Sequence, residues 1–482
     1  MNFSMIVYIL AWVLKIEGAS MILPLLCSLI YKENDIALCF FIIGTASILL
    51  GYILTAKKPK KIAFYAREGF VIVAACWVVL SLVGALPFFI SGRIPHYIDA
   101  LFEIVSGFTT TGSSILSDVE ALGKGLLFWR SFSHWIGGMG VLVLVLTVLP
   151  LGGGYNMMIM KAESPGPEVT KMVPRVADTA KALYKIYFIL TIIMILVFLL
   201  SGMPFFDALC IGFGTAGTGG FAIRNSGMAD YSMLSQFLIT IFMILFGVNF
   251  NVYYLIQRKK FSDAFHSEEA RGYFIIIAAS TLFITFNIFQ SIGKGFLFAL
   301  HHAFFTVGSI ITTTGFSTLD FNEWTVPSQM VILFLMICGA CAGSTGGGLK
   351  VSRLIILLKS LAKELHLIIH PEAVKKVRLE GKCLDHVVVR SVSTYLVAYC
   401  FIYMISIFLI SFDGYDFLTN FSAISATFNN IGPGLGKVGP LSNFSVYSYF
   451  SKLVMIFDML AGRLEIFPML ILFSIKTWKK TN

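Results

Sequence analysis

Charged residues are scarce in this chain. Asp, Glu, Lys and Arg make up 13% of its 482 residues, whereas apolar residues make up 57%, and the mean hydropathy is +0.84. An ordinary soluble domain carries about 25% charged residues. The composition therefore excludes a soluble globular protein and predicts a polytopic protein embedded in a lipid bilayer.

Cysteine is also sparse, and its placement argues against two kinds of site. Eight cysteines lie mostly inside apolar runs, and none has a histidine at ligand spacing. The nearest pair, Cys338 and Cys341, lies three residues apart in an expected helix, where packing accounts for both residues. The sequence thus favours neither a disulfide framework nor a metal centre, and we expect no cofactor.

The positive charge of the chain reports its orientation in the membrane. The formal net charge is +10, yet 26 of the 36 Lys and Arg residues fall in five loops, at 57–67, 161–185, 258–271, 350–390 and 476–480. Basic loops stay in the cytoplasm, so we expect both termini there and no nucleic-acid partner. The largest loop, 350–390, is either a docking surface for a cytosolic subunit or a solvated face.

Ten apolar runs are long enough to cross the membrane, since a hydrocarbon core of about 30 Å takes about 20 helical residues. They begin near Ser4, Ile36, Gly69, Phe128, Leu183, Ser235, Gly272, Pro327, Val387 and Ser448. The first has no small-residue cleavage site after it, so we expect an uncleaved helix rather than a signal peptide.

Four shorter apolar runs each end in a polar tetrapeptide that contains glycine. The tetrapeptides are Thr109–Gly112, Gly217–Gly220, Thr312–Gly315 and Asn429–Gly432. The run before the first one, residues 97–108, makes a helix of only about 18 Å, which fits a re-entrant half-helix whose irregular exit lines a pore. Glycine lets backbone carbonyls turn inward and replace the water shell of a cation. One such tetrapeptide is common in turns, but four in the same setting predict a selectivity filter.

The spacing of these loops predicts an all-α polytopic membrane protein with four pseudo-repeats around a central pore. Each repeat consists of a helix, a half-length pore helix with its filter loop, and a second helix. Two N-terminal transmembrane helices occupy 1–56, and the pore repeats occupy 57–160, 161–260, 261–365 and 366–482. Asp99, Asp207 and Asp416 lie near the outer starts of three half-helices, which leaves the negative helix ends aimed inward at the cation.

A glycine-rich segment interrupts the eighth crossing. Glycine costs about 1 kcal/mol per helical position, so we expect an unwound loop at bilayer depth, formed by Gly343, Ser344, Thr345, Gly346, Gly347 and Gly348. A nucleotide-binding P-loop is excluded because Leu349 stands where that motif needs lysine and no strand precedes it. The loop could obstruct or open an ion path, and the alternative is a close helix contact through small residues.

Arg463 lies inside the last apolar crossing, where an arginine costs about 2.5–3.5 kcal/mol. Glu465, two residues on, faces another side of the helix, so we expect the guanidinium to bind carbonyls of the 343–348 loop. Lys452, earlier in the same crossing, is either a second compensated charge or a side chain that reaches back to the outer interface.

Several of these segments together carry a family resemblance that covers nearly the whole chain. They are Thr109–Gly112, Ala162–Pro167, Pro174–Arg175, Ser309–Gly315, Ala342–Gly348, Asn430–Gly434 and Gly462–Phe467. In them the chain resembles the membrane subunits of the Trk-type potassium transporters, the TrkH family of the Trk/Ktr/HKT superfamily. The resemblance implies a homodimer in the bacterial cytoplasmic (inner) membrane, with a gating loop at 343–348 that Arg463 contacts. It also implies a cytosolic nucleotide-binding regulatory subunit of the TrkA kind.

The same resemblance implies K+ as the transported ion, because glycine in all four filters is typical of the potassium-selective members. We expect K+ to bind at Thr110, Thr111, Gly112, Thr218, Gly219, Gly220, Thr313, Thr314, Gly315, Asn430, Ile431 and Gly432. The second loop departs from the family pattern through two added glycines, and the fourth lacks threonine.

Two other functions remain open from the sequence. A symporter driven by protons or sodium needs a titratable group on the path, and no acidic residue lies in a filter, so channel-like conduction is favoured. A membrane-embedded enzyme would have to use His134 or the pair His301 and His302, and neither has a carboxylate or nucleophile in its segment. We therefore expect no enzyme.

Overall fold

A computed structural model of the chain describes residues 2–57, 59, 66–140 and 176–478. This part is almost entirely helical, and its strands form one small antiparallel hairpin of β1 (Arg378–Leu379) and β2 (Lys382–Cys383). Six helical spans there are long and apolar enough to cross a membrane, or seven if one bent pair counts as a span. The expected helical multi-pass architecture is confirmed. The segments 162–167 and 174–175, which contribute to the family resemblance, lie outside the described residues.

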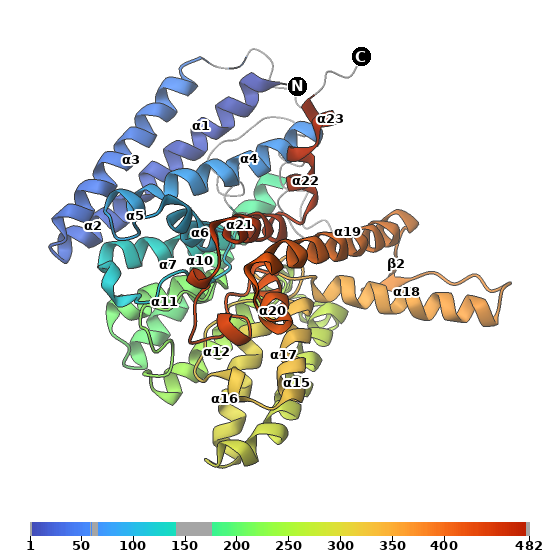
Figure 1. The fold of residues 1–482 in the computed structure, drawn as a ribbon. Coiled ribbons are helices and arrows are strands. Elements are labelled where there is room, and N and C mark those ends of the chain that lie inside the picture. The colour runs from blue at the N-terminus through green and yellow to red at the C-terminus, as the bar shows by residue number, and fades with distance from the viewer. Residues whose placement is uncertain (1, 58, 60–65, 141–175, 479–482) are drawn as a thin grey trace.

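The helices repeat the same order four times (Figure 1). Each repeat opens with a long helix: α4 (Ala66–Gly84), α10 (Val176–Leu200), α15 (Glu268–Ile292) and α19 (His386–Ile410). A short helix then leads into each tetrapeptide: α6 (Tyr97–Phe108), α11 (Phe205–Gly217), α16 (Phe296–Ile311) and α20 (Phe417–Phe428). A second helix closes each repeat: α7 (Lys124–Gly138), α12 (Met233–Gly247), α17 (Val326–Cys338) and α21 (Tyr449–Arg463). The exact repeat boundaries stay a prediction.

The remaining helices lie before, within, between or after the repeats. Before the first repeat stand α1 (Phe3–Ser20), α2 (Ile22–Ile30) and α3 (Asn34–Thr55), with α1 packed along α3 (Figure 1). The shorter helices are α5 (Leu86–Ile90) between α4 and α6, α13 (Phe250–Gln257) and α14 (Phe261–Phe265) between α12 and α15, and α22 (Phe467–Phe473) and α23 (Ile475–Trp478) after the last repeat. The helix α18 (Val351–Ile369) and the start of α19 extend sideways from the body, with the β hairpin between them (Figure 1).

The second helix of every repeat ends early, which the sequence indicated for the eighth crossing alone. These four helices have 13 to 15 residues, about 20–23 Å, so none spans the hydrocarbon core by itself. The chain bends by 88° between α12 and α13, and an irregular segment separates α17 from α18. After α21 the backbone turns through positive φ angles at Glu465 and Ile466. The expectation of continuous crossings at α7, α12 and α21 is therefore wrong for the described residues, whereas the expected break after α17 is present.

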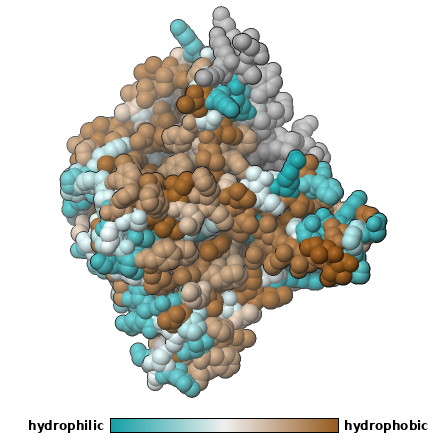
Figure 2. All heavy atoms as spheres, turned by 45° about the vertical axis from the view of Figure 1, so that its right-hand side comes forward, coloured by the Kyte–Doolittle hydropathy of each residue, from teal (hydrophilic) through white to brown (hydrophobic). Residues whose placement is uncertain are grey.

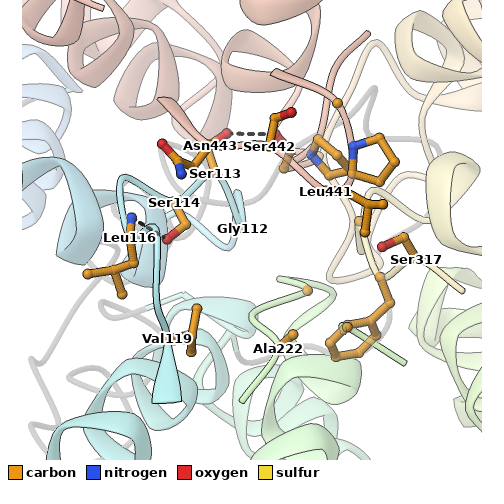
Figure 3. Close-up of a pocket in the computed structure, with 18 of the residues that line it drawn as sticks. Gly112, Ser113, Ser114, Leu116, Val119, Ala222, Ser317, Leu441, Ser442 and Asn443 are labelled. Atoms are coloured by element: carbon orange, nitrogen blue, oxygen red, sulfur yellow. Dashed lines mark hydrogen bonds between the residues drawn. The ribbon is translucent and has the colours of Figure 1, made fainter. Parts of the chain in front are cut away.

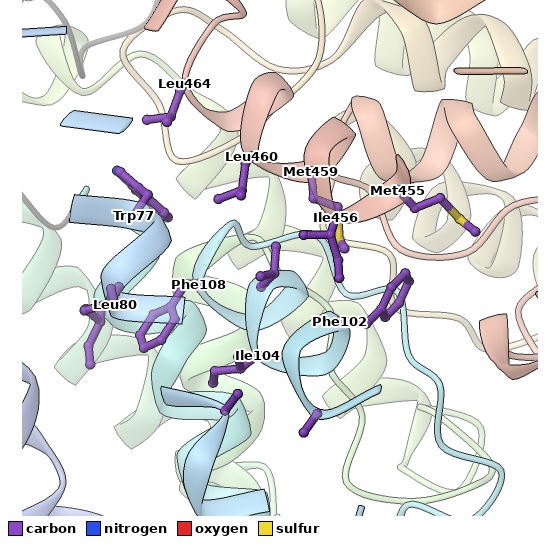
Figure 4. Close-up of a cluster of buried hydrophobic side chains, with 14 of the residues drawn as sticks. Trp77, Leu80, Phe102, Ile104, Phe108, Met455, Ile456, Met459, Leu460 and Leu464 are labelled. Atoms are coloured by element: carbon purple, nitrogen blue, oxygen red, sulfur yellow. The ribbon is translucent and has the colours of Figure 1, made fainter. Parts of the chain in front are cut away.

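Large apolar side chains fill the space behind the first filter loop. Trp77 of α4, Phe102 and Phe108 of α6, and Met455 and Met459 of α21 are all at most 1% exposed (Figure 4). This packing holds the short helices rigidly although they are too short to anchor themselves in a bilayer. The outer surface is apolar as well, and brown side chains cover much of the face in Figure 2, as expected of a surface that contacts lipid.

Candidate ion pathway

The four tetrapeptide loops share one backbone conformation. The residue two before each filter glycine is left-handed, with φ of 55° to 58° at Thr110, Thr218, Thr313 and Asn430. The filter glycines also have positive φ, from 74° to 106°, at Gly112, Gly220, Gly315 and Gly432. The residue between them donates its N–H over 2.8 Å to the carbonyl five residues earlier, in the pairs Thr111 to Ser106, Gly219 to Gly214, Thr314 to Ser309 and Ile431 to Ala426. The loops are thus equivalent although their sequences differ.

The filter glycines close into a ring. A Cβ atom on Gly112, Gly220 or Gly315 would overlap a carbonyl oxygen of the next repeat, which belongs to Gly219, Thr314 or Ile431 respectively. A Cβ on Gly432 would lie 3.0 Å from the carbonyl oxygen of Thr111, which returns the series to the first repeat. Each of these carbonyls belongs to the residue before a filter glycine. The ring therefore excludes a side chain at Gly112, Gly220 and Gly315 and leaves little room for one at Gly432, independently of the φ requirement.

One cavity opens onto all four filter glycines (Figure 3). We call it the outer cavity, because the pattern of basic loops predicts that this side faces outward. The described residues that line it include Ser113, Ser317 and two arginines, Arg130 and Arg224, and none of the lining residues is an aspartate or glutamate. Nearby, Asn225 donates its side-chain amide to Asp118 over 2.8 Å, which lowers the pKa of that carboxyl. A negative charge therefore persists close to the cavity at neutral pH.

The acids expected at the outer starts of the half-helices have definite partners. Asp99 pairs with Lys452 at 2.6 Å, and the lysine side chain is only 5% exposed. Asp207 pairs with Arg224 at 2.7 Å, and Asp416 accepts the backbone N–H of Thr419 as the N-cap of α20. Lys452 is thus a compensated buried charge rather than one that reaches back to the interface.

A buried ion pair behind the first two filters was missed by the sequence reasoning. Glu103 of α6 and Arg130 of α7 are 2.6 Å apart, with side chains at most 3% exposed. Glu103 also accepts the N–H of Ile115 over 2.9 Å, whereas Arg130 donates to the carbonyl of Ala222 over 2.7 Å. The pair therefore braces the exits of two neighbouring filter loops. Its signal in the sequence was an acid inside one half-helix and an arginine inside the following apolar run.

Removing one partner of this pair should destabilise the protein strongly. Changing Arg130 to Gln leaves Glu103 buried without its counter-charge, so we expect the free energy of unfolding to fall by about 3–5 kcal/mol. Thermal unfolding of the purified protein, followed by tryptophan fluorescence, measures the loss. Arg93→Gln is the matched control, because Arg93 and its partner Asp35 are 44% and 65% exposed and a surface pair contributes about 1 kcal/mol or less. Equal losses in the two variants would contradict a bracing role.

The glycine-rich segment lies against the third and fourth filter loops, on the side opposite the outer cavity. The N–H of Gly347 donates to the Oγ1 of Thr313 over 2.6 Å. A Cβ on the same glycine would overlap the carbonyl oxygen of Asn429, and one on Gly346 would lie 2.9 Å from the carbonyl oxygen of Thr312. The segment 343–348, which we call the gating loop after its expected role, therefore lies directly against the third and fourth filter loops.

Arg463 is the last residue of α21 and binds carbonyls of two other repeats. It donates to the carbonyl of Thr345 in the gating loop over 2.8 Å, and to the carbonyls of Gly137 and Gly138 at the end of α7. The last carbonyls of a helix lack partners within the helix, so they suit a buried cation. Glu465 pairs with Arg353 at 2.5 Å instead, in agreement with its expected separation from Arg463.

The threonine hydroxyls beside the filter make several different contacts. Those of Thr110 and Thr218 donate to the preceding carbonyl over 2.7 and 2.6 Å. In the fourth loop, which lacks threonine, the amide of Asn430 donates to Thr111 Oγ1 over 2.8 Å. Asn430 therefore links the fourth loop to the first.

The histidines have polar partners but no carboxylate among them in the described part of the chain. His134 Nδ1 lies 2.7 Å from the carbonyl of Gly107, and His301 Nε2 lies 2.9 Å from Gln236 Oε1. His302 Nδ1 lies 2.8 Å from Thr318 Oγ1. The described residues also contain no group of three His, Cys, Asp or Glu side chains that could hold a metal ion. These contacts position helices and offer no catalytic arrangement.

Comparison with known proteins places this geometry in a family. The chain matches the family TrkH, described as cation transport protein, over residues 37–292 and 279–481. The Trk system potassium uptake protein TrkH of Salmonella typhimurium is 36% identical over 493 residues, and that of Escherichia coli K12 is 35% identical over 492, each match covering 100% of both chains. The crystal structure of the potassium transporter TrkH from Vibrio parahaemolyticus matches with a TM-score of 0.88 and 32% identity, covering 99% of this chain and 100% of that one. These relatives are transporters and not enzymes, and the chain belongs to the TrkH family of cation transport proteins.

Proposed function

We propose that this chain is the membrane subunit of a potassium uptake system and conducts K+ through the ring of four filter loops. The relatives described above are named potassium uptake proteins. The observation that carries the proposal is the closed ring, in which each filter glycine faces the carbonyl of the next repeat. Four oxygen atoms at equivalent positions can replace the water around a monovalent cation.

In this proposal, K+ sheds its water at the carbonyls of the last two residues of each tetrapeptide. Thr110, Thr218 and Thr313 shape the ring nearer the gating loop, with Asn430 in the fourth position. Several weak sites in series allow fast passage. A negative cell interior favours entry by about 2.3 kcal/mol per charge for each 100 mV. The membrane is the bacterial cytoplasmic (inner) membrane, with both termini in the cytoplasm.

The gating loop is the proposed barrier. Its contacts with Thr313 and Arg463 would have to break or shift before an ion could leave the filter. We infer that a cytosolic nucleotide-binding subunit of the TrkA kind controls this step and that the chain acts as a homodimer. The basic loop 350–390 supports the first inference, because α18 and the hairpin extend from the body where such a subunit could reach them (Figure 1).

Uptake by the purified chain in liposomes tests the proposal. K+ and Na+ fluxes are compared at two clamped membrane potentials without a pH gradient, and protein-free liposomes serve as the blank. We expect potential-driven K+ flux that strongly exceeds Na+ flux. Flux that appears only with an imposed proton or sodium gradient would replace channel-like conduction by the symport alternative, and equal K+ and Na+ fluxes would overturn the selective filter.

A further inference from the structure

One carboxylate from a neighbouring helix holds both ends of the gating loop. Glu269 of α15 is 5% exposed. Its Oε1 accepts the N–H of Ala342 over 2.6 Å and that of Ser352 over 3.1 Å. Ala342 directly precedes the gating loop, and Ser352 is the second residue of α18. The side chain of Glu269 therefore links the residue that precedes the gating loop to the helix that follows the loop.

The backbone donors at these positions have no local acceptor. The N-cap of α18, Lys350, has a φ of 77° and provides no side-chain cap. The first N–H groups of a helix need acceptors from elsewhere, and the positive helix end favours a carboxylate. Glu269 supplies that cap from another helix, so the start of α18 depends on it.

Glu269 also reaches the bend in the second repeat. Its Oε2 accepts the side-chain amide of Asn249 over 3.2 Å, and Asn249 caps α13 through Asn251. The N–H of Phe250 donates to the carbonyl of Gly343 over 3.0 Å. The carboxylate of Glu269 thus contacts both the break between α12 and α13 and the residue that precedes the gating loop.

A second set of contacts connects Glu269 to the β hairpin. In the turn between β1 and β2, Glu380 Oε1 accepts the hydroxyl of Ser267 over 2.9 Å and the backbone N–H of Glu269 over 3.3 Å. Lys359 of α18 pairs with Glu268 and donates to the carbonyl of Arg378 over 2.9 Å. These hydrogen bonds and the ion pair therefore connect the hairpin to the first turn of α15, which contains Glu269.

We propose that Glu269 is the positioning residue that keeps the gating loop against the filter and couples it to the β hairpin. The proposal rests on the proposed function, because it assigns the loop the role of barrier. Without the carboxylate, Ala342 and the start of α18 lose their shared acceptor, and the loop separates more readily from Thr313.

Replacing Glu269 with Gln tests this role through ion flux. The amide keeps the shape of the side chain but loses the charge, so we expect resting K+ flux in liposomes to rise about tenfold or more. The ratio of K+ to Na+ flux should stay unchanged, because no filter carbonyl contacts Glu269. Glu364→Gln is the matched control: Glu364 is an acid on α18 that pairs with its neighbour Lys363 and is 63% exposed, and its loss should leave resting flux at the parent level.

Labelling of Cys341 provides an independent readout of loop position. Its thiol is fully buried, whereas Cys383 and Cys400 are exposed. A maleimide reagent followed by peptide mass spectrometry should label Cys383, which lies in β2, in every variant, but Cys341 several-fold faster in Glu269→Gln; Cys400 lies within the candidate span of α19 and is not used as a control. Glu269→Asp keeps the charge but is one methylene shorter, so its carboxylate cannot reach both N–H donors. This variant should give intermediate labelling and replaces the Gln variant if that one does not fold.

The outcomes separate this inference from the proposed function. Parent-level flux and parent-level Cys341 labelling in both Glu269 variants would overturn the positioning role and leave K+ conduction intact. Absence of selective K+ flux in the parent would overturn the proposed function, and Cys341 labelling would still decide whether Glu269 holds the loop.

Discussion

Serine in place of Gly315 is expected to lower the K+ to Na+ flux ratio by about tenfold, since a non-glycine residue held in a rare backbone conformation stores about 1–3 kcal/mol. Gly315 has a φ of 86°. A Cβ atom there would overlap the carbonyl oxygen of Ile431 and lie 2.9 Å from Pro433 Cδ. The strain and the overlap both push a carbonyl out of the ring, so the spacing that suits K+ is lost.

The flux ratio is measured in liposomes at a fixed membrane potential. Gly414→Ser is the matched control, because Gly414 has a φ of 77° but no atom lies within 4 Å of the position of its Cβ. It introduces the same kind of backbone strain away from the ring and should keep the parent ratio. If Gly315→Ser also kept that ratio, the third loop would have to be removed from the filter assignment.

Shortening the gating loop is expected to raise resting K+ flux more than any single substitution. Deletion of 346–348 removes the bond from Gly347 to Thr313 and the backbone that lies against the carbonyls of Thr312 and Asn429. The path beyond the filter then loses its obstruction. Selectivity should remain within about twofold of the parent, because the filter carbonyls set it and the deletion leaves their ring in place.

Two further variants make this result interpretable. Deletion of 371–373, an exposed turn after α18, has the same length and should leave resting flux unchanged. Arg463→Gln keeps the loop intact but removes the guanidinium from the carbonyl of Thr345, and we expect a smaller rise. Resting flux that stays at the parent level after deletion of 346–348 would show that this segment is not the barrier.

The half-helices and their irregular exits were predictable because their signals are local. A run of twelve apolar residues cannot span a bilayer, and a glycine at the fourth position of each tetrapeptide permits the positive φ that the structure has there. The left-handed backbone two residues before each filter glycine was harder to predict, because asparagine only tolerates that region and the β-branched threonine of the other three loops rarely adopts it. The contact between Arg463 and the gating loop was predictable for a different reason, since a cation in an apolar run requires compensation.

The contacts that the sequence did not reveal join residues far apart in the chain. Glu103 and Arg130 are 27 residues apart, Glu269 and Ser352 are 83 apart, and Asp99 and Lys452 are 353 apart. In a single sequence, the charged residues of these pairs have no evident partner nearby in the chain, so each of them looks like an isolated charge. The early ends of α7, α12 and α21 were hidden for a similar reason, because hydropathy stays high across a break whose backbone groups find partners in other repeats.

The sequence by itself determined that this protein lies in a membrane, that its pore elements recur four times and that glycine stands where the backbone must turn. Those properties depend on composition, run length and φ, which neighbouring residues control. Only the tertiary structure decided that the four loops close into one ring and that the gating loop contacts the third and fourth of them. It also decided that Glu269 accepts N–H groups from residues on both sides of the gating loop. These properties depend on which helices pack together, because a buried charge or an unpaired N–H selects its partner by distance in space and not by distance along the chain.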